Sequence, residues 1–159
     1  MREPDPSLTE SEAKVLADVI EYGVHVVHVL EDESGPGFSY TVGLWHSFGQ
    51  PEVLVFGLGD EIAHELLNLV ADEASDGDKC THGTRHEGLL EGYPVQFLGI
   101  ESSEHARYLG LAQWAYEGEE FPVVQLVYPD RMGRWPWDPA TKKGFRECQP
   151  VVGRRDPSA

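Results

Sequence analysis

The chain of 159 residues carries 28 acidic and 12 basic residues, a formal net charge of −16 at pH 7, and 40% of its residues are hydrophobic. This length and apolar content predict one folded domain with a sizeable core. The acidic balance excludes general nucleic-acid binding, which needs a basic surface. No apolar run reaches the roughly 18 residues of a membrane-spanning helix, so we expect no membrane partner.

The ends of the chain and its cysteines suggest where the protein resides. The polar first residues are not typical of a secretory signal, and the distant Cys80 and Cys148 provide no disulfide framework. We therefore expect a reduced, cytoplasmic protein. Residues 1–7 are predicted to be a flexible arm, residues 8–153 a single globular domain and residues 154–159 a flexible tail. The oligomeric state stays open.

Three helices are predicted in chain order. The first follows a capping-box pattern that begins at Thr9, carries an apolar stripe at helical spacing and ends at Gly23. The second begins at Asp60, and a third, with a wide aromatic face, begins near residue 102. The expected inner face of the second helix comprises Ile62, Leu66, Leu67 and Val70.

The strands predicted from apolar periodicity are residues 24–30, 38–45, 53–58, 92–100 and 121–128. Residues 53–58 contain no polar side chain, which is typical of a strand covered on both faces. Together the elements predict an α+β fold: a mainly antiparallel sheet of five or six strands, either open or curled into a split barrel, packed by about three helices.

The loop after residue 45 is the first candidate site, since it places His46 and Glu52 at the ends of two predicted strands. His46 could transfer a proton near neutral pH, with Glu52 orienting it or acting as the base. Tyr40 and Thr41, on the strand before this loop, are candidate ligand-binding residues. The alternative is a connecting loop whose His46 and Glu52 satisfy only local backbone groups.

The second candidate is the rigid, aromatic segment 129–138. Asp130, Arg131, Arg134 and Trp135 could bind an anionic ligand there, because an arginine side chain matches carboxylates and phosphates and an indole offers an apolar wall. The alternative is that these charges pair among themselves. The sequence predicts a small-molecule pocket shared between the 45–52 loop and this segment.

A C-x-H-x3-H pattern formed by Cys80, His82 and His86 is the third candidate. Zinc would need a fourth ligand, or an open position in a catalytic site, and this spacing matches no standard zinc arrangement. The alternatives are an ordinary polar loop and a metal-dependent hydrolase.

Four motifs in this order resemble the bacterial domain-of-unknown-function family DUF 4262: Y-T-V-G-L, P-E-V-L-V-F-G-L, Q-L-V-Y-P-D-R-M-G-R-W-P-W-D and a late Q-P-V-V-G. The resemblance covers about residues 20–153 and implies no established activity or catalytic residue. The element order is also similar to that of flavin-reductase-like split barrels. That second similarity makes flavin a candidate cofactor, although a fold analogy does not establish function.

Two main functions stay open at this point. The first is a domain that binds an anionic or flavin-like small molecule, either as a binding domain alone or as an enzyme. The second is a non-catalytic acidic interaction protein, of inhibitor or immunity type, that binds a basic protein partner.

Overall fold

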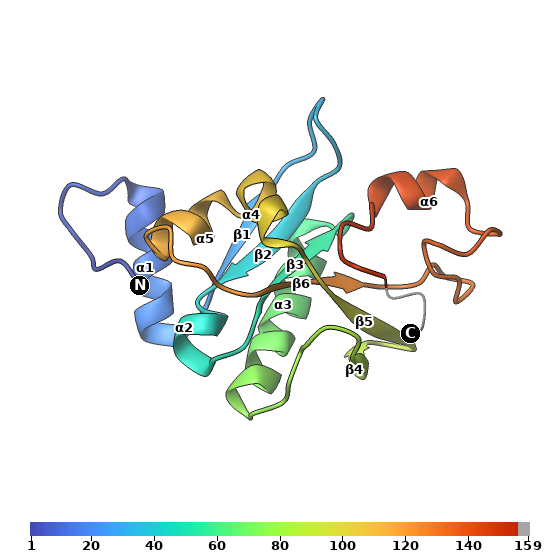
Figure 1. Cartoon of the computed structure of the whole chain (residues 1–159), viewed down its shortest axis with the longest axis horizontal. Helices are drawn as coiled ribbons and strands as arrows, with labels where there is room; N and C mark the ends of the chain where they lie inside the picture. The colour runs from blue at the N-terminus through green and yellow to red at the C-terminus, as the bar shows by residue number, and fades with distance from the viewer. Residues whose placement is uncertain (156–159) are drawn as a thin grey trace.

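The computed structural model describes residues 1–155 and shows an α+β fold with one six-stranded, mostly antiparallel sheet (Figure 1). Five neighbouring pairs build the sheet, and only the β3–β6 pair is parallel. The strands lie in the order β1 (His25–Val29), β2 (Phe38–Val42), β3 (Glu52–Phe56), β6 (Val123–Val127), β5 (Tyr93–Gly99) and β4 (Arg85–Leu90).

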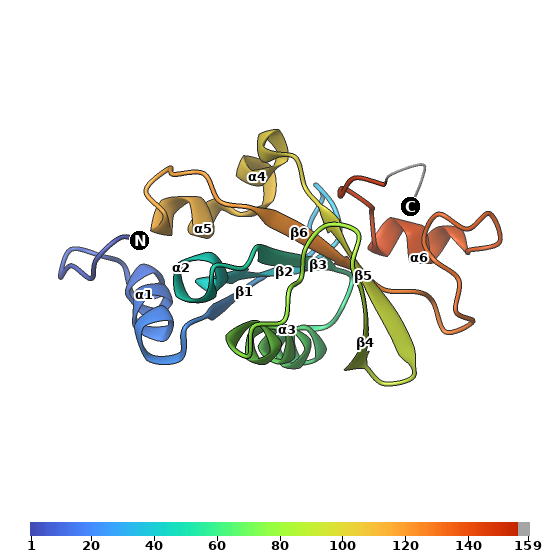
Figure 2. The same cartoon turned by 60° about the horizontal axis from the view of Figure 1, so that its bottom comes forward.

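Helices cover both faces of this sheet (Figure 2). They are α1 (Glu10–Tyr22), α2 (Leu44–Phe48), α3 (Asp60–Ser75), α4 (Ser102–Tyr108), α5 (Gly110–Ala115) and α6 (Lys143–Cys148). The long helix α3 packs on one face, whereas α1 and α5 pack on the other. Within residues 1–155, no helix is both long and apolar enough to cross a lipid bilayer.

Strand β3 lies in the middle of the core, as its apolar sequence predicts. Val53 and Val55 pack toward α3, while Leu54 and Phe56 pack toward α1 and α5. All four side chains are at most 1% exposed. This alternation follows from the pleat of a strand, whose successive side chains point to opposite faces.

The split-barrel alternative is wrong, because the sheet is open and β1 and β4 are its two edges.

The predicted third helix is divided into α4 and α5 at Leu109, whose φ of −108° and ψ of 49° are not helical. Strand β4 escaped prediction because its residues are largely polar and its register shifts between His86 and Leu90. On α3, Ile62 is 54% exposed and Ala63 takes the buried position.

The two ends of the described chain contact the domain. The backbone N–H of Arg2 donates to the carbonyl of Ala115 at 2.7 Å, and its guanidinium lies over the Trp114 ring. Near the other end, buried Gln125 accepts hydrogen bonds from the backbone of Val152 and Gly153. The flexibility expected for residues 1–7 and 154–159 stays a prediction, and residues 156–159 of that tail lie outside the described part.

Candidate functional site

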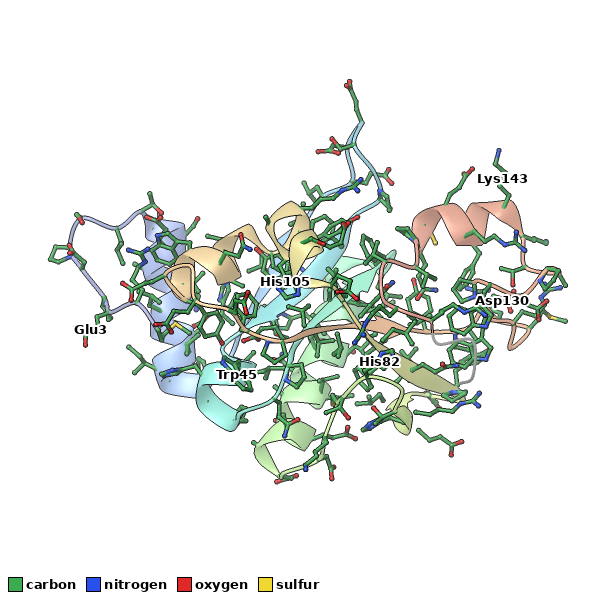
Figure 3. All side chains as sticks on the ribbon, viewed as in Figure 1. Glu3, Trp45, His82, His105, Asp130 and Lys143 are labelled. Atoms are coloured by element: carbon green, nitrogen blue, oxygen red, sulfur yellow. The ribbon has the colours of Figure 1, made fainter. Side chains whose placement is uncertain are left out.

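The two segments expected to share a pocket lie at opposite ends of the sheet. Strands β3 and β6 run parallel, with Glu52 opposite Val123, so both strands start beside the 45–52 loop and run toward segment 129–138. Trp45 and Asp130 accordingly lie far apart, on opposite sides of the centre of the molecule (Figure 3). The predicted shared pocket is therefore not formed; ligand binding itself stays a prediction.

The carboxylate of Glu52 is the centre of a buried hydrogen-bond network. Its side chain is fully buried, and its two oxygens accept from five donors: Thr41 Oγ1 at 2.8 Å, the backbone N–H groups of Gly43, Leu44 and Trp45 at 3.1 Å each, and the Tyr116 hydroxyl. Three of these donors are the first N–H groups of α2 or its N-cap. Glu52 therefore anchors a helix start whose backbone donors have no intrahelical partner.

This network leaves Glu52 little capacity to act as a base, because a carboxylate has about four lone-pair sites and five donors already approach it. Burial raises the pKa of Glu52, and the hydrogen bonds from Tyr116 and the α2 backbone oppose that rise. Burial and the nearby charge of Glu52 also raise the pKa of Tyr116. Glu52 is connected to His46 only indirectly: the backbone N–H of His46 donates to the Tyr116 hydroxyl at 3.2 Å, and that hydroxyl donates to Glu52.

Tyr40 and Thr41 are also engaged inside the core. The Tyr40 hydroxyl accepts from the backbone N–H of Leu111 at 3.1 Å, and Thr41 accepts from the N–H of Val53 while donating to Glu52. Both side chains are at most 2% exposed. The structure thus brings Thr41 and Glu52 together, and their hydrogen bonds join β2 and β3 to the start of α2.

In segment 129–138, Asp130 and Arg134 pair with each other. Asp130 accepts from the backbone N–H of Met132 at 2.9 Å and of Arg134 at 2.8 Å, and from Arg134 Nε at 3.0 Å. Burial raises the pKa of Asp130, but these hydrogen bonds from Arg134 and Met132 outweigh it and lower the pKa overall. The alternative in which the charged side chains of this segment pair with one another therefore holds for Asp130 and Arg134.

The Trp135 ring contacts Trp137 in its own segment and Arg85 on β4. Its ring stacks on Trp137, with centroids 5.5 Å apart and planes within 3°. The guanidinium of Arg85 lies 5.2 Å from the Trp135 centroid, and that of Arg155 lies 4.5 Å from the Trp137 centroid. Such cation–π contacts stabilise the folded segment, so the Trp135 ring is engaged with protein groups.

A hollow of about 630 Å³ lies beside this segment, bounded by the start of α3, the β4–β5 turn, residues 128–134 and α6. We call it the apolar hollow. Its apolar wall includes Leu58, Ile62, Leu90, Tyr128 and Phe145.

Three basic side chains, Arg131, Arg134 and Lys142, also line the apolar hollow, and Arg134 is paired there with Asp130. The sequence analysis identified Arg131 and Arg134 but not Lys142. No sequence pattern places Lys142 beside Arg131, because the two are joined by the irregular path of residues 132–141. The exposed apolar side chains of Ile62 and Met132, 54% and 76% exposed, mark the site only once the structure is known.

The structure gathers only two of the three residues of the predicted metal-binding pattern. Cys80 and His86 lie together, but the third nearby donor is Glu73, in the last turns of α3. His82 instead uses its Nδ1 to accept from the backbone N–H of Gly99 at 2.8 Å. Burial and the charges of Glu73 and Asp78 raise the pKa of the Cys80 thiol to about 12. Glu73 escaped prediction because it belongs to a helix preceding the motif.

Residues 18–142 match the model of a family described as "Domain of unknown function (DUF4262)". No match was found among curated proteins or among solved structures.

Proposed function

The chain belongs to the DUF4262 family, and because the description of that family names no activity, we propose from the geometry that it binds a small molecule with an apolar body and an anionic group. The binding site of this proposal is the apolar hollow. A volume of about 630 Å³ lies within the range of ordinary small-molecule sites, which are mostly apolar with a few polar groups that orient the ligand.

The observation that carries the proposal is the pair of basic groups on an apolar wall. Within residues 1–155, the side chains of Arg131 and Lys142 take part in no ion pair or hydrogen bond with another residue. Their neighbour Arg134 is neutralised by Asp130. Glu91 is the carboxylate that lines the hollow without an ion-pair partner in the described part of the chain. The two unpaired basic side chains therefore outnumber it, and the excess positive charge attracts an anionic group of a ligand.

Flavin is one ligand of this chemical class that can be tested directly. The open sheet removes the split-barrel analogy that suggested flavin, but a flavin phosphate has both a planar body and an anionic end. Titration with flavin mononucleotide should shift the flavin absorption spectrum if it binds in the hollow. An unchanged spectrum at saturating protein would exclude flavin from the proposed ligands.

The anionic preference is tested with a pair of fluorescent probes. We expect anilinonaphthalene sulfonate to bind the protein. We expect Arg131→Ala combined with Lys142→Ala to weaken that binding about thirtyfold, since two charge-assisted contacts of on the order of 1 kcal/mol each are lost. The uncharged analogue phenylnaphthylamine should bind the wild type and the double variant equally. Ile62→Ser should weaken both probes.

Lys143→Ala is the matched control. Lys143 is the next residue of the chain, projects from the outer side of α6 (Figure 3) and pairs with Glu147 at 3.5 Å. This variant should bind both probes as the wild type does. Equal sulfonate affinity in the double variant and the wild type would contradict the proposal, provided that near-ultraviolet circular dichroism shows both to be folded.

The interaction-protein alternative predicts a different result. An acidic protein that binds a basic partner should capture one partner in stoichiometric amount, with affinity that falls steeply as salt concentration rises. Arg131→Ala and Lys142→Ala should then leave capture unchanged or strengthen it, because they make the protein more acidic. Capture together with no probe binding would favour this alternative over the apolar hollow.

A further inference from the structure

Three potential metal ligands meet where α3 is joined to β4. Glu73 belongs to α3, Cys80 lies in the connecting loop, and His86 is on β4. One ligand atom from each, the Glu73 carboxylate oxygen, Cys80 Sγ and a His86 ring nitrogen, lie within 4.8 Å of one another. This cluster is outside the apolar hollow and independent of the function proposed there.

The hydrogen bond on the far side of the His86 ring fixes which nitrogen faces the cluster. His86 Nε2 lies 3.2 Å from the carbonyl oxygen of Lys79, and a carbonyl can only accept, so Nε2 carries the proton. In the neutral ring, Nδ1 then presents a lone pair toward Glu73 Oε2, 3.6 Å away. Metal-bound histidines commonly donate their second N–H to a backbone carbonyl in this way.

The aromatic ring of Phe97 restricts His86 further. The two rings meet edge to face at 5.0 Å with an interplanar angle of 85°. The imidazole is therefore held in one orientation by a hydrogen bond and by packing. A ligand held in its binding orientation loses less conformational freedom when it binds.

The Glu73 carboxylate has an oxygen that lacks a hydrogen-bond partner among the described residues. This atom, Glu73 Oε2, is buried, and its distance of 3.6 Å from His86 Nδ1 exceeds that of a normal hydrogen bond. The cluster thus sets a carboxylate oxygen and an imidazole lone pair toward each other. Two electron-rich atoms in this position are stabilised by a cation between them.

The end of helix α3 adds to the negative potential at the cluster. The last turn of α3 contains no basic residue, so the negative end of its dipole is not neutralised within the helix. Asp76 and Asp78 follow directly in the connecting loop. This environment favours a divalent cation over the metal-free cluster.

We propose that Glu73, Cys80 and His86 bind a zinc ion. Zinc accepts thiolate, imidazole and carboxylate ligands, and its bond lengths place two ligand atoms about 3.3–3.6 Å apart in tetrahedral geometry. The pair His86 Nδ1 and Glu73 Oε2 already lies in that range, and Cys80 Sγ, which is within 4.8 Å of both, completes the set by moving toward them. Three protein ligands leave a fourth position for water, which is the arrangement of catalytic zinc sites.

The competing explanation is a protonated His86 that pairs with Glu73 and binds no metal. It predicts that zinc leaves the melting temperature unchanged. Zinc binding to the folded protein instead raises the melting temperature in the wild type by mass action, and the rise should disappear in Cys80→Ser.

Cobalt(II) provides the direct test, because it substitutes for zinc and reports its ligands in its absorption spectrum. The full chain, freed of any histidine tag and kept reduced, should bind one equivalent of cobalt. We expect a thiolate-to-cobalt charge-transfer band and the strong visible bands of a four-coordinate ion, both lost when zinc is added. Glu73→Gln should weaken cobalt binding at least tenfold, and Cys80→Ser should remove the charge-transfer band.

Two controls separate this site from other donors of the chain. Cys148→Ser removes the other cysteine, whose Sγ donates to the carbonyl of Phe145 on α6, and should leave the band intact. His82→Ala should also retain the band. The proposal is overturned if the wild type shows no charge-transfer band, if Cys80→Ser keeps it, or if Glu73→Gln binds cobalt as tightly as the wild type does. Glu73 is partly exposed, so its variant is expected to fold even if Cys80→Ser does not.

Discussion

Replacing Glu52 by alanine is expected to lower the free energy of unfolding by about 3–5 kcal/mol, the usual cost of removing one partner from a buried charged network. The variant leaves the N–H groups of Gly43, Leu44 and Trp45 without their acceptor. For a domain of this size the loss corresponds to a fall of about 10–15 °C in melting temperature. Urea unfolding followed by circular dichroism measures it.

Glu52→Gln tests the role of the charge at nearly constant volume. Both carboxylate oxygens accept from backbone N–H groups, Oε1 from Leu44 and Oε2 from Gly43 and Trp45. Either orientation of the glutamine amide therefore places an NH₂ group against an N–H donor. We expect this variant to lose most of the stability that alanine loses.

Two milder variants and one control define the network. Thr41→Val and Tyr116→Phe each remove a single hydroxyl donor and should cost less than Glu52→Ala, about 1–2 kcal/mol each. Glu65→Ala, at an exposed position of α3, should change stability by less than about 0.5 kcal/mol. If Glu52→Ala behaves like Glu65→Ala, the buried network does not anchor α2. A His46→Ala variant with unchanged stability would agree with a contact made only by its backbone.

The second large effect is expected at Gly57, which has a φ of +76°. A Cβ there would lie 2.6 Å from the carbonyl oxygen of Cys148 and 2.9 Å from the Tyr128 hydroxyl. The first of these is a backbone atom at the end of α6, so the whole helix end must move. We expect Gly57→Ala to cost at least about 3 kcal/mol, of which roughly 1–2 kcal/mol comes from the positive φ.

Gly49→Ala separates the two contributions. Gly49 has a similar φ of +66°, but a Cβ there would meet nothing within 4 Å. This variant should therefore lose only about 1–2 kcal/mol. Equal losses at both glycines, measured by urea unfolding, would show that the approach of α6 to Gly57 contributes nothing. Because Phe145 of α6 and Lys142 at its N-cap line the apolar hollow, Gly57→Ala should also weaken binding of the sulfonate probe.

The sequence by itself determined the elements whose pattern is local. Capping and a helical stripe located α1, alternation located β1 and β2, and a run of apolar residues identified β3 as buried on both faces. The strand predicted over residues 38–45 was too long, because β2 ends at Val42 and Leu44–Phe48 forms the helix α2, whose first N–H groups donate to Glu52. The family resemblance was confirmed by the match over residues 18–142. These signals are readable because each depends on residues only a few positions apart.

Only the tertiary structure decided which distant side chains meet. Local periodicity does not specify which strands are neighbours, and the parallel pairing of β3 with β6 is what separates the 45–52 loop from segment 129–138. The same limit applies to Glu73, which joins Cys80 and His86 through the packing of α3 against the sheet. It also applies to Glu52, whose sequence position suggested a base but whose five hydrogen-bond donors come from three separate parts of the fold. A side chain's chemistry is set by the groups packed around it, and those groups are brought together by long-range contacts.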